Sequence, residues 1–345
     1  MAESFSKILV IQTAFIGDAI LTLPLIQALK LNYPHASIDV TVVPRTAELF
    51  DHHPAISKIY PYDKRGMDKG VNGLWRLRKL LSEQNYDLVL VPHRSLRSAL
   101  LTWLLHPKLS IGFDRSAGRW MFKKVVRYDP STHEIERNLS LLTPLNIPHL
   151  TTSLPRLYPS DQDVYTIDSI FKEYGLQRYK SIGAVAPGTI WNTKRWPSDR
   201  FASVCKRLAS EEIALILIGG TEDQELCEEV KAMAQTKNLY SVAGRLSLLQ
   251  SAEMIRRCKV LISNDSAPMH LAVAVGTPVV AIFGATIPGY GFAPRGPYDV
   301  VIETQGLKCR PCSIHGGQKC PIKTFDCMLK ITPELVVDKV KPLLH

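Results

Sequence analysis

The sequence has 345 residues, of which 46% are hydrophobic, and a formal net charge of +10 at pH 7. This length supports two cores of ordinary size, so we expect two domains. The apolar stretches at 98–105 and 271–284 are shorter than the roughly 18 residues of a membrane-spanning helix, and we expect no secretory signal peptide. The prediction is a cytosolic protein whose charge favours polyanionic partners: nucleic acid, phosphorylated glycolipid or an anionic membrane.

The first half of the chain alternates short apolar runs with helical runs, which predicts parallel strands covered by helices. The predicted strands are 7–12, 37–43, 57–60, 86–91 and 109–113, and the predicted helices are 18–31, 72–83, 95–105 and 132–145. Three prolines and the absence of a steady period mark 146–160 as an interdomain linker.

Beyond the linker the same alternation begins again. A helix at 162–174 precedes predicted strands at 181–186, 214–218, 260–262 and 279–283, which alternate with helices at 198–210, 223–234 and 247–258. The predicted fold class is therefore α/β, with one Rossmann-like domain at 1–160 and a second at 161–345. The last helix is a candidate to pack back on the first domain.

Three loops follow predicted strands at the sheet edge where ligands bind in folds of this kind. In one of them, NDSAPMH, a strand runs into a helix start, where unpaired N–H groups and a partial positive charge favour a phosphate. Ser266 and the amide of Ala267 are the natural donors, and His270 lies one turn further on. Asp265 would repel the phosphate unless it caps the helix or holds a hydroxyl. The alternative is a simple helix cap and a buried core histidine.

The loop PGTIWNTKRWP, residues 187–197, follows another predicted strand and contains Lys194 and Arg195. A cation at the carboxyl edge of a strand can neutralise a diphosphate leaving group. Such a pair is usually exposed to solvent, but Trp191 and Trp196 beside it favour burial or a stacking partner.

The loop QTAFIGDAI, residues 12–20, places Gly17 and Asp18 at the start of the first helix. It lacks the G-x-G-x-x-G fingerprint of dinucleotide-binding folds, which argues against an oxidoreductase. Asp18 is either a helix N-terminal acid, worth about 0.3–1 kcal/mol, or a general base that takes a proton from an acceptor hydroxyl.

In this order and spacing, the three loops resemble the ADP-heptose:lipopolysaccharide heptosyltransferases of glycosyltransferase family 9. The resemblance covers essentially the whole chain and lies in residues 8–30, 187–197 and 263–284. It implies a GT-B fold, in which two Rossmann-like domains face each other across a cleft, the first binding the acceptor and the second the nucleotide sugar. It also implies an inverting transfer from ADP-heptose as co-substrate, with no required metal or other cofactor.

The resemblance further implies roles for individual residues. Asp18 is the catalytic base, and Lys194 is the catalytic cation on the donor diphosphate. The remaining donor-binding candidates lie in loops of the second domain: Thr189, Glu222, Asp265, Ser266, Ala267 and His270. Asp223 is an alternative to Glu222 at the nucleoside.

The stretch from Arg94 to Arg127 contains eight Lys or Arg residues and one acid, Asp114. It is either a solvated basic face or, as the resemblance implies, a surface for the phosphorylated lipid A core at the cytoplasmic face of the inner membrane. The acceptor-binding candidates are Arg94, Arg97, Arg115 and Arg119. His133 and Arg137, four residues apart on a predicted helix, could join the acceptor site, but such a pair is more often a surface contact, so they are interpreted as a surface pair outside the site.

Four of the seven cysteines, Cys309, Cys312, Cys320 and Cys327, have a spacing close to a four-thiolate zinc pattern but without a second tight pair. Reduced packing thiols are favoured over structural zinc, and disulfides are not expected in the cytosol. Similar cysteine-bearing tails are typical of the second heptosyltransferase, which favours that subfamily.

Three other functions stay open at this point. They are a family 9 transferase with another nucleotide sugar or acceptor, an epimerase or hydrolase of nucleotide sugars, and a nucleic-acid binder. The last is suggested by the charge alone, since the basic residues lack the interleaved aromatic residues of a nucleic-acid module.

Overall fold

The structure is a computed structural model that describes residues 4–147 and 154–344. The chain divides into two compact units, Met1–Tyr158 and Pro159–His345. Residues 148–153 of the predicted linker lie outside the described part. Among the described residues, no helix combines the length and apolarity that crossing a membrane requires.

The first unit is built on a parallel sheet of six strands in the order β3-β2-β1-β4-β5-β6. Its strands are β1 (Lys7–Gln12), β2 (Ser37–Val42), β3 (Lys58–Pro61), β4 (Leu88–Val91), β5 (Leu109–Phe113) and β6 (Lys124–Val126). The central strands β1 and β4 are buried along almost their whole length. This burial on both faces explains why they read as continuous apolar runs.

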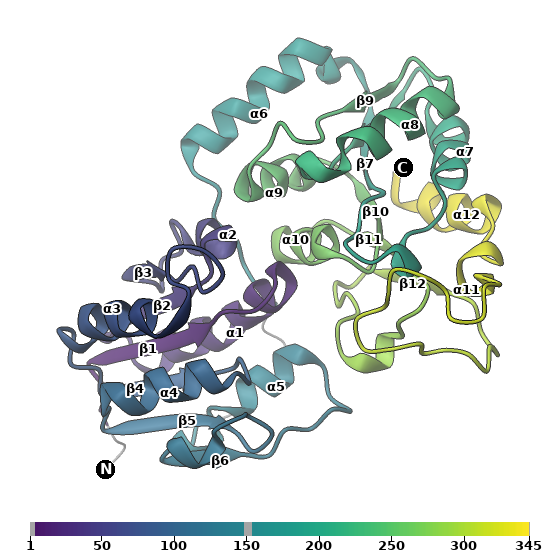
Figure 1. The fold of residues 1–345 in the computed structure, drawn as a ribbon. Coiled ribbons are helices and arrows are strands. Elements are labelled where there is room, and N and C mark those ends of the chain that lie inside the picture. Colours follow the sequence, from purple (N-terminus) through teal and green to yellow (C-terminus); the bar gives the residue numbers. More distant parts are fainter. Residues whose placement is uncertain (1–3, 148–153, 345) are drawn as a thin grey trace. The chain divides into compact units, whose positions relative to one another are not determined.

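Helices cover both faces of this sheet (Figure 1). They are α1 (Ile16–Asn32), α2 (Pro44–Ala47), α3 (Gly70–Ser82), α4 (Leu96–Leu105) and α5 (Glu134–Ser140), with 3-10 turns η1 (Glu48–Phe50), η2 (Arg119–Met121) and η3 (Thr143–Leu145). Helix α1 packs against α5, and α3 packs against α4. Leu9 and Val89 of the sheet join Leu74 and Leu77 of α3 in one buried cluster.

The second unit repeats this topology. Its parallel sheet has the order β12-β11-β10-β7-β8-β9, which is the order of the first sheet when β7 is counted as strand one. The strands are β7 (Ser181–Ala186), β8 (Ile213–Leu217), β9 (Leu239–Ser241), β10 (Val260–Asn264), β11 (Val279–Phe283) and β12 (Val300–Glu303). Each sheet therefore has a topological switch point, between β1 and β4 in the first and between β7 and β10 in the second.

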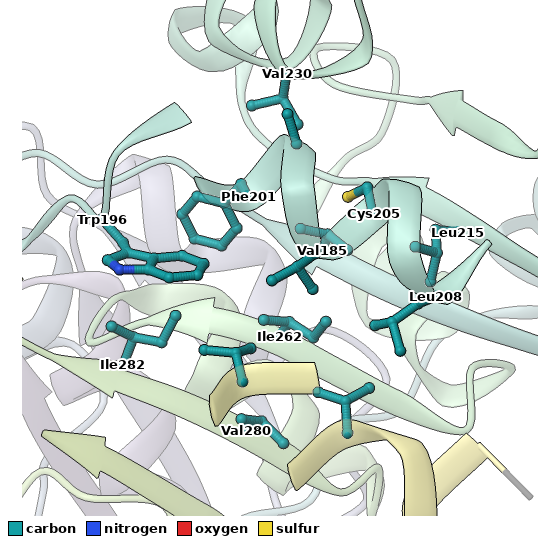
Figure 2. Packing of buried hydrophobic residues seen from close by; sticks show 14 of the residues in the cluster. Val185, Trp196, Phe201, Cys205, Leu208, Leu215, Val230, Ile262, Val280 and Ile282 are labelled. Carbon is teal, nitrogen blue, oxygen red and sulfur yellow. The ribbon is translucent and has the colours of Figure 1, made fainter. Parts of the chain in front are cut away.

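The second sheet is also covered on both faces. Its helices are α6 (Asp161–Tyr174), α7 (Ser198–Leu208), α8 (Gln224–Ala234), α9 (Leu248–Arg256), α10 (Ala267–Val275), α11 (Asp326–Leu329) and α12 (Pro333–Leu344), with 3-10 turns η4 (Leu176–Arg178), η5 (Asn192–Lys194), η6 (Thr221–Asp223) and η7 (Pro288–Tyr290). Figure 2 shows Trp196 beside Phe201 above the strand residues Val185 and Ile262. The two rings meet edge to face at 5.0 Å, and Trp196 is wholly buried.

The α/β class with two parallel sheets is confirmed, but some elements differ from the prediction. The predicted helix 132–145 ends at Ser140 and is followed by the separate turn η3, because Pro144 has no N–H with which to continue the helix. The edge strands β6, β9 and β12 were not predicted, since they are too short to show a period. The last helix, α12, contributes Val336 and Val340 to the buried core of the second unit.

Candidate functional site

At the switch point of the second sheet, one buried side chain ties two loops together. Asn264, at the end of β10, donates from its amide to the carbonyl of Pro187 (2.8 Å) and accepts from the N–H of Trp196 (3.0 Å). The side chain is fully buried. Both ends of the loop 187–196 are thereby fixed beside β10, and this places Lys194, near the end of the loop, next to the start of α10.

Lys194 and Asp265 form an ion pair there, with 2.7 Å between Nζ and Oδ2 and side chains only 13% and 9% exposed. The hydroxyl of Thr286 donates to the same carboxylate oxygen at 2.6 Å. A buried ion pair recovers its desolvation cost only when further hydrogen bonds complete it, and Thr286 supplies one. Asp265 was expected to cap the helix or hold a hydroxyl; it accepts from the hydroxyl of Thr286, and Lys194 matches its charge. Thr286 was not predicted, although it follows a predicted strand.

The N-terminus of α10 begins directly after Asp265. Ser266 occupies the N-cap position without a side-chain cap bond, and its Oγ lies 3.4 Å from the carbonyl of Asn264. Ser266 and Ala267 are half-buried, and the first N–H groups of a helix have no partner within it. His270, one turn along, is buried. The structure thus brings a helix N-terminus and an ammonium group together beside Asp265.

The other predicted donor residues lie in two neighbouring loops of this unit. The carbonyl of Thr189 accepts from the guanidinium of Arg195 at 2.8 Å. Asp223 accepts from the N–H of Gly220 at 3.1 Å, and a Cβ added at Gly188 would lie 2.1 Å from its Oδ1. This carboxylate is therefore packed against the backbone of the loop 187–196, called the donor loop below, whereas Glu222 is exposed.

The switch point of the first sheet is cationic. Thr13, after β1, shares a 2.9 Å hydrogen bond between its Oγ1 and Nδ1 of His93, which follows β4. Lys64, after β3, donates to the carbonyl of Thr13 at 2.5 Å. Burial lowers the pKa of His93 to about 4, with further lowering by Lys64 and Arg94. Burial also lowers the pKa of Lys64. None of these three residues was predicted, although each lies just after a strand.

Asp18 is the third residue of α1, and its Oδ2 accepts from the N–H of Phe15 at 3.2 Å. It therefore acts as a helix N-terminal acid, one of its two predicted roles. Its charge also reaches Glu134, whose pKa is raised to about 7 by burial first and by Asp18 in addition. Glu134 pairs with Arg137 at 3.2 Å, so a second carboxyl group lies within electrostatic reach of Asp18.

The interpretation of His133 and Arg137 as a surface pair is wrong. Both are buried, at 5% and 4% exposed, because α5 packs against α1. The ring of His133 accepts from the N–H of Ile135 at 3.2 Å. The guanidinium of Arg137 lies 5.2 Å from the ring centre of Tyr128.

The four predicted acceptor arginines lie in three different settings. Arg94 and Arg115 both lie over the ring of Tyr128, at 4.2 and 5.7 Å. Arg97 donates to the carbonyl of Lys64 at 3.3 Å, which places it beside the cationic switch point. Arg119 is exposed and donates to a carbonyl of its own loop.

The cysteines fall into two groups. Cys205 and Cys227 are buried in α7 and α8, and Cys258 is buried just after α9; burial raises the pKa of each thiol to about 12. The C-terminal four line a cavity of about 280 Å³ together with Pro311 and Phe325. Across residues 4–147 and 154–344, no group of three or more His, Cys, Asp or Glu side chains is placed to hold a metal ion.

Two doubly wound parallel sheets of the same strand order, each with polar loops at its switch point, define an α/β protein of the GT-B class. Residues 74–321 match the family model described as Glycosyltransferase family 9 (heptosyltransferase). The chain belongs to glycosyltransferase family 9, and it is accordingly an enzyme of the glycosyltransferase class.

The chain is similar to lipooligosaccharide heptosyltransferase 2 of Haemophilus influenzae, with 26% identity over 98% of this chain and 99% of the relative. It is 31% identical to lipopolysaccharide heptosyltransferase 3 of Escherichia coli K12, over 78% of this chain and 80% of the relative. Among solved structures, the E. coli ADP-heptose lps heptosyltransferase II matches with a TM-score of 0.80 and 25% identity, over 98% of both chains.

Proposed function

We propose that this protein is an inverting heptosyltransferase that moves heptose from ADP-L-glycero-D-manno-heptose to the heptose/Kdo inner core of lipopolysaccharide, in the manner of heptosyltransferase II. The names of the Haemophilus relative and of the E. coli structure support this assignment. The observation that carries it is the buried Lys194–Asp265 pair at the N-terminus of α10. A lysine ammonium and a helix N-terminus both favour the binding of a diphosphate.

Lys194 is the cation for the leaving ADP in this proposal. A lysine ammonium has three donor hydrogens, and Asp265 uses one of them, so two can reach phosphate oxygens. Ser266, Ala267 and the hydroxyl of Thr189 add donors around the same diphosphate. His270 completes the pocket from the next turn of α10. Glu222 binds the nucleoside, because Asp223 is already engaged with the loop backbone.

Asp18 is the general base. It takes the proton from the acceptor hydroxyl while that oxygen attacks the anomeric carbon of heptose, and the bond from this carbon to the phosphate oxygen breaks. ADP leaves with the electron pair, and the configuration inverts because attack and departure are on opposite faces. Lys194 and the helix N-terminus neutralise the charge that develops on the diphosphate, so the scheme requires no metal ion.

The first unit binds the acceptor in this proposal. The phosphates and carboxylates of the acceptor bind to the cations around Thr13, and the contributing residues are Lys64, Arg94, Arg97, Arg115 and Arg119. The net charge of +10 would also favour peripheral association with the anionic cytoplasmic face of the inner membrane.

The test is mass spectrometry of the product formed by purified protein from ADP-heptose and mono-heptosylated lipid A core. The expected product carries one additional heptose, and a Lys194→Met variant serves as the matched control. Omitting the acceptor tests for a hydrolase or epimerase, and replacing the donor with another nucleotide sugar tests for a different transferase. Equal donor turnover with and without acceptor would contradict the proposal, as would transfer from another nucleotide sugar alone.

A further inference from the structure

The segment between β12 and α11, residues 304–325, contains no helix or strand. Most of its side chains are exposed or half-buried. Structureless stretches of this length are uncommon inside a compact unit and are usually functional. Its contacts lead to the donor loop.

The first part of the segment is fastened to the end of β11. Arg310 donates to the carbonyl of Thr286 and to the carboxylate of Glu303, both at 2.7 Å. The N–H of Cys312 donates to the carbonyl of Ala285 at 2.9 Å. Arg310 thus holds the backbone of the residue whose hydroxyl donates to Asp265.

The middle of the segment is fastened to η5, the turn that ends at Lys194. The N–H of Thr193 donates to the carbonyl of Gly317 at 2.9 Å, and the N–H of Gly317 donates back to Oγ1 of Thr193 at 2.7 Å. The amide of Gln318 donates to the carbonyl of Ile190 at 3.2 Å. Thr193 is only 4% exposed, so this reciprocal pair is shielded from water.

Gly316 lies directly on the side chain of Lys194. Its φ is +85°, and a Cβ added there would lie 2.9 Å from Cγ and 3.1 Å from Cδ of Lys194. Only glycine fits both the backbone conformation and the space. The backbone at Gly316 therefore covers the alkyl chain of Lys194 and accounts in part for its 13% exposure.

We propose that the turn Gly316–Gln318 is a positioning element for the donor-binding cation. It clamps Thr193 and covers the stem of Lys194, so that Nζ is held against Asp265 and toward the donor diphosphate. Gly316, Thr193 and Thr286 thereby act on the reaction through Lys194. The inference rests on the proposed function for the identity of the ligand, but the clamp on Lys194 has consequences that need no donor.

The C-terminal cysteines give this segment a small interior of its own. All four line one cavity of about 280 Å³. Burial acts to raise the pKa of the Cys320 thiol, but the neighbouring backbone of Phe325 and residues 322–324 outweighs it and lowers that pKa. Three of the four lie in the segment, and the fourth, Cys327, is buried in α11, so the cavity lies between the segment and that helix.

Gly316→Ala tests the clamp, and Gly306→Ala is its matched control. Both glycines belong to the same segment and have positive φ, +85° and +75°, but a Cβ at Gly306 meets nothing within 4 Å. We expect Gly316→Ala to lower kcat/KM for the donor about tenfold and Gly306→Ala to change it less than twofold. Equal effects of the two substitutions would overturn the proposal, because backbone strain alone would then explain them.

A second readout works without any donor. The rate at which an amine-acylating reagent labels Lys194, followed by mass spectrometry of the peptide, is expected to rise several-fold in Gly316→Ala and to stay unchanged in Gly306→Ala. If heptose transfer fails while Lys194 labelling responds in this way, the clamp stands and only the proposed function is wrong. Unchanged labelling in Gly316→Ala would overturn the clamp.

Thr193 provides an independent variant should Gly316→Ala not fold. Thr193→Val keeps the shape of the side chain but removes the Oγ1 that accepts from Gly317, whereas Thr193→Ser keeps that oxygen. We expect Val to increase Lys194 labelling and to weaken ADP binding several-fold, and Ser to restore both. Identical behaviour of the two variants would contradict the clamp.

Discussion

The two sheets of this protein have the same strand order, yet their switch points carry different chemistry. In the second sheet a cation is paired, since Lys194 meets Asp265 at 2.7 Å. In the first sheet the side chains gathered around Thr13 are Lys64 and His93, and the catalytic group predicted in this unit is the carboxylate of Asp18. Strand order thus determines where a site forms in such a fold, whereas the loop side chains determine what it does.

The two switch points also differ in burial. Asn264, Asp265 and Thr286 are all buried, and each is hydrogen-bonded within the second unit. A buried and satisfied network of this kind is rigid, which suits a small ligand held in one pose. Among the candidate cations of the first unit, Lys64 and Arg97 are half-buried, whereas Arg94, Arg115 and Arg119 are exposed. That arrangement suits a larger anionic ligand bound through many separate contacts.

The largest expected effect comes from Asp18, which tests whether the first switch point supplies the base. Asp18→Asn keeps an acceptor for the N–H of Phe15 but removes the basic group. We expect kcat to fall by about 10²–10⁴-fold, with ADP affinity unchanged by calorimetry. Asp163→Asn, in the corresponding capping position of α6, is the control and is expected to keep full activity. Normal turnover of Asp18→Asn would remove the base assignment.

Substitution of Lys194 tests whether the second switch point supplies the cation that neutralises the diphosphate. Lys194→Met is expected to lower kcat/KM by about 10²–10³-fold. It also leaves Asp265 buried without its cation, which should reduce the free energy of unfolding by about 3 kcal/mol. Both quantities are measurable on one preparation, by steady-state kinetics and by urea denaturation.

The double variant Lys194→Met/Asp265→Asn separates the two effects. Removing both charges should restore most of the stability, because no unpaired carboxylate remains, but it should not restore transfer. Recovery of activity in the double variant would show that Lys194 matters only for folding.

The sequence patterns predicted the long elements and the loops between them better than the contacts at the site. Strands β1, β7 and β11 match their predicted bounds, since a buried strand is a continuous apolar run. Lys194 and Asp265 were predicted because polar residues follow such runs. The partners that complete the site were missed, because they are distant in sequence: Thr286 lies 21 residues from Asp265, Lys64 lies 51 from Thr13, and Gly317 lies 124 from Thr193. No local pattern reports contacts of that range.

The pH dependence of stability tests the burial of the first switch point. The pKa of His93 falls from 6.5 to about 4 in the folded protein. Between these values the unfolded chain binds a proton that the folded chain does not, so the free energy of unfolding falls as the pH falls through this window. The full difference corresponds to at most about 3 kcal/mol, and partial exposure of the ring reduces it.

His93→Asn should remove this contribution, so the difference in unfolding free energy between the wild type and the variant should shrink from pH 6.5 to pH 4. Comparing the two proteins cancels the titration of His53, whose pKa is lowered to about 4, and of Glu134, whose pKa is raised to about 7. His35→Asn, at an exposed position, is the control. A difference that does not change with pH would mean that His93 is not buried in its neutral form.

The smallest expected effect comes from Lys64, which distinguishes an acceptor surface from a second donor site. Lys64→Met removes one cation beside Thr13 and should raise KM for the lipid core about tenfold while leaving ADP affinity unchanged. The dependence of acceptor KM on salt should also become shallower, because one screened attraction is lost.

Lys58→Met is the matched control. Lys58 begins the same strand, β3, that ends just before Lys64, and it therefore lies at the opposite edge of the sheet. If both variants raised KM equally, general positive charge would explain acceptor binding. If Lys64→Met weakened ADP binding instead, the assignment of acceptor binding to the first switch point and donor binding to the second would be wrong.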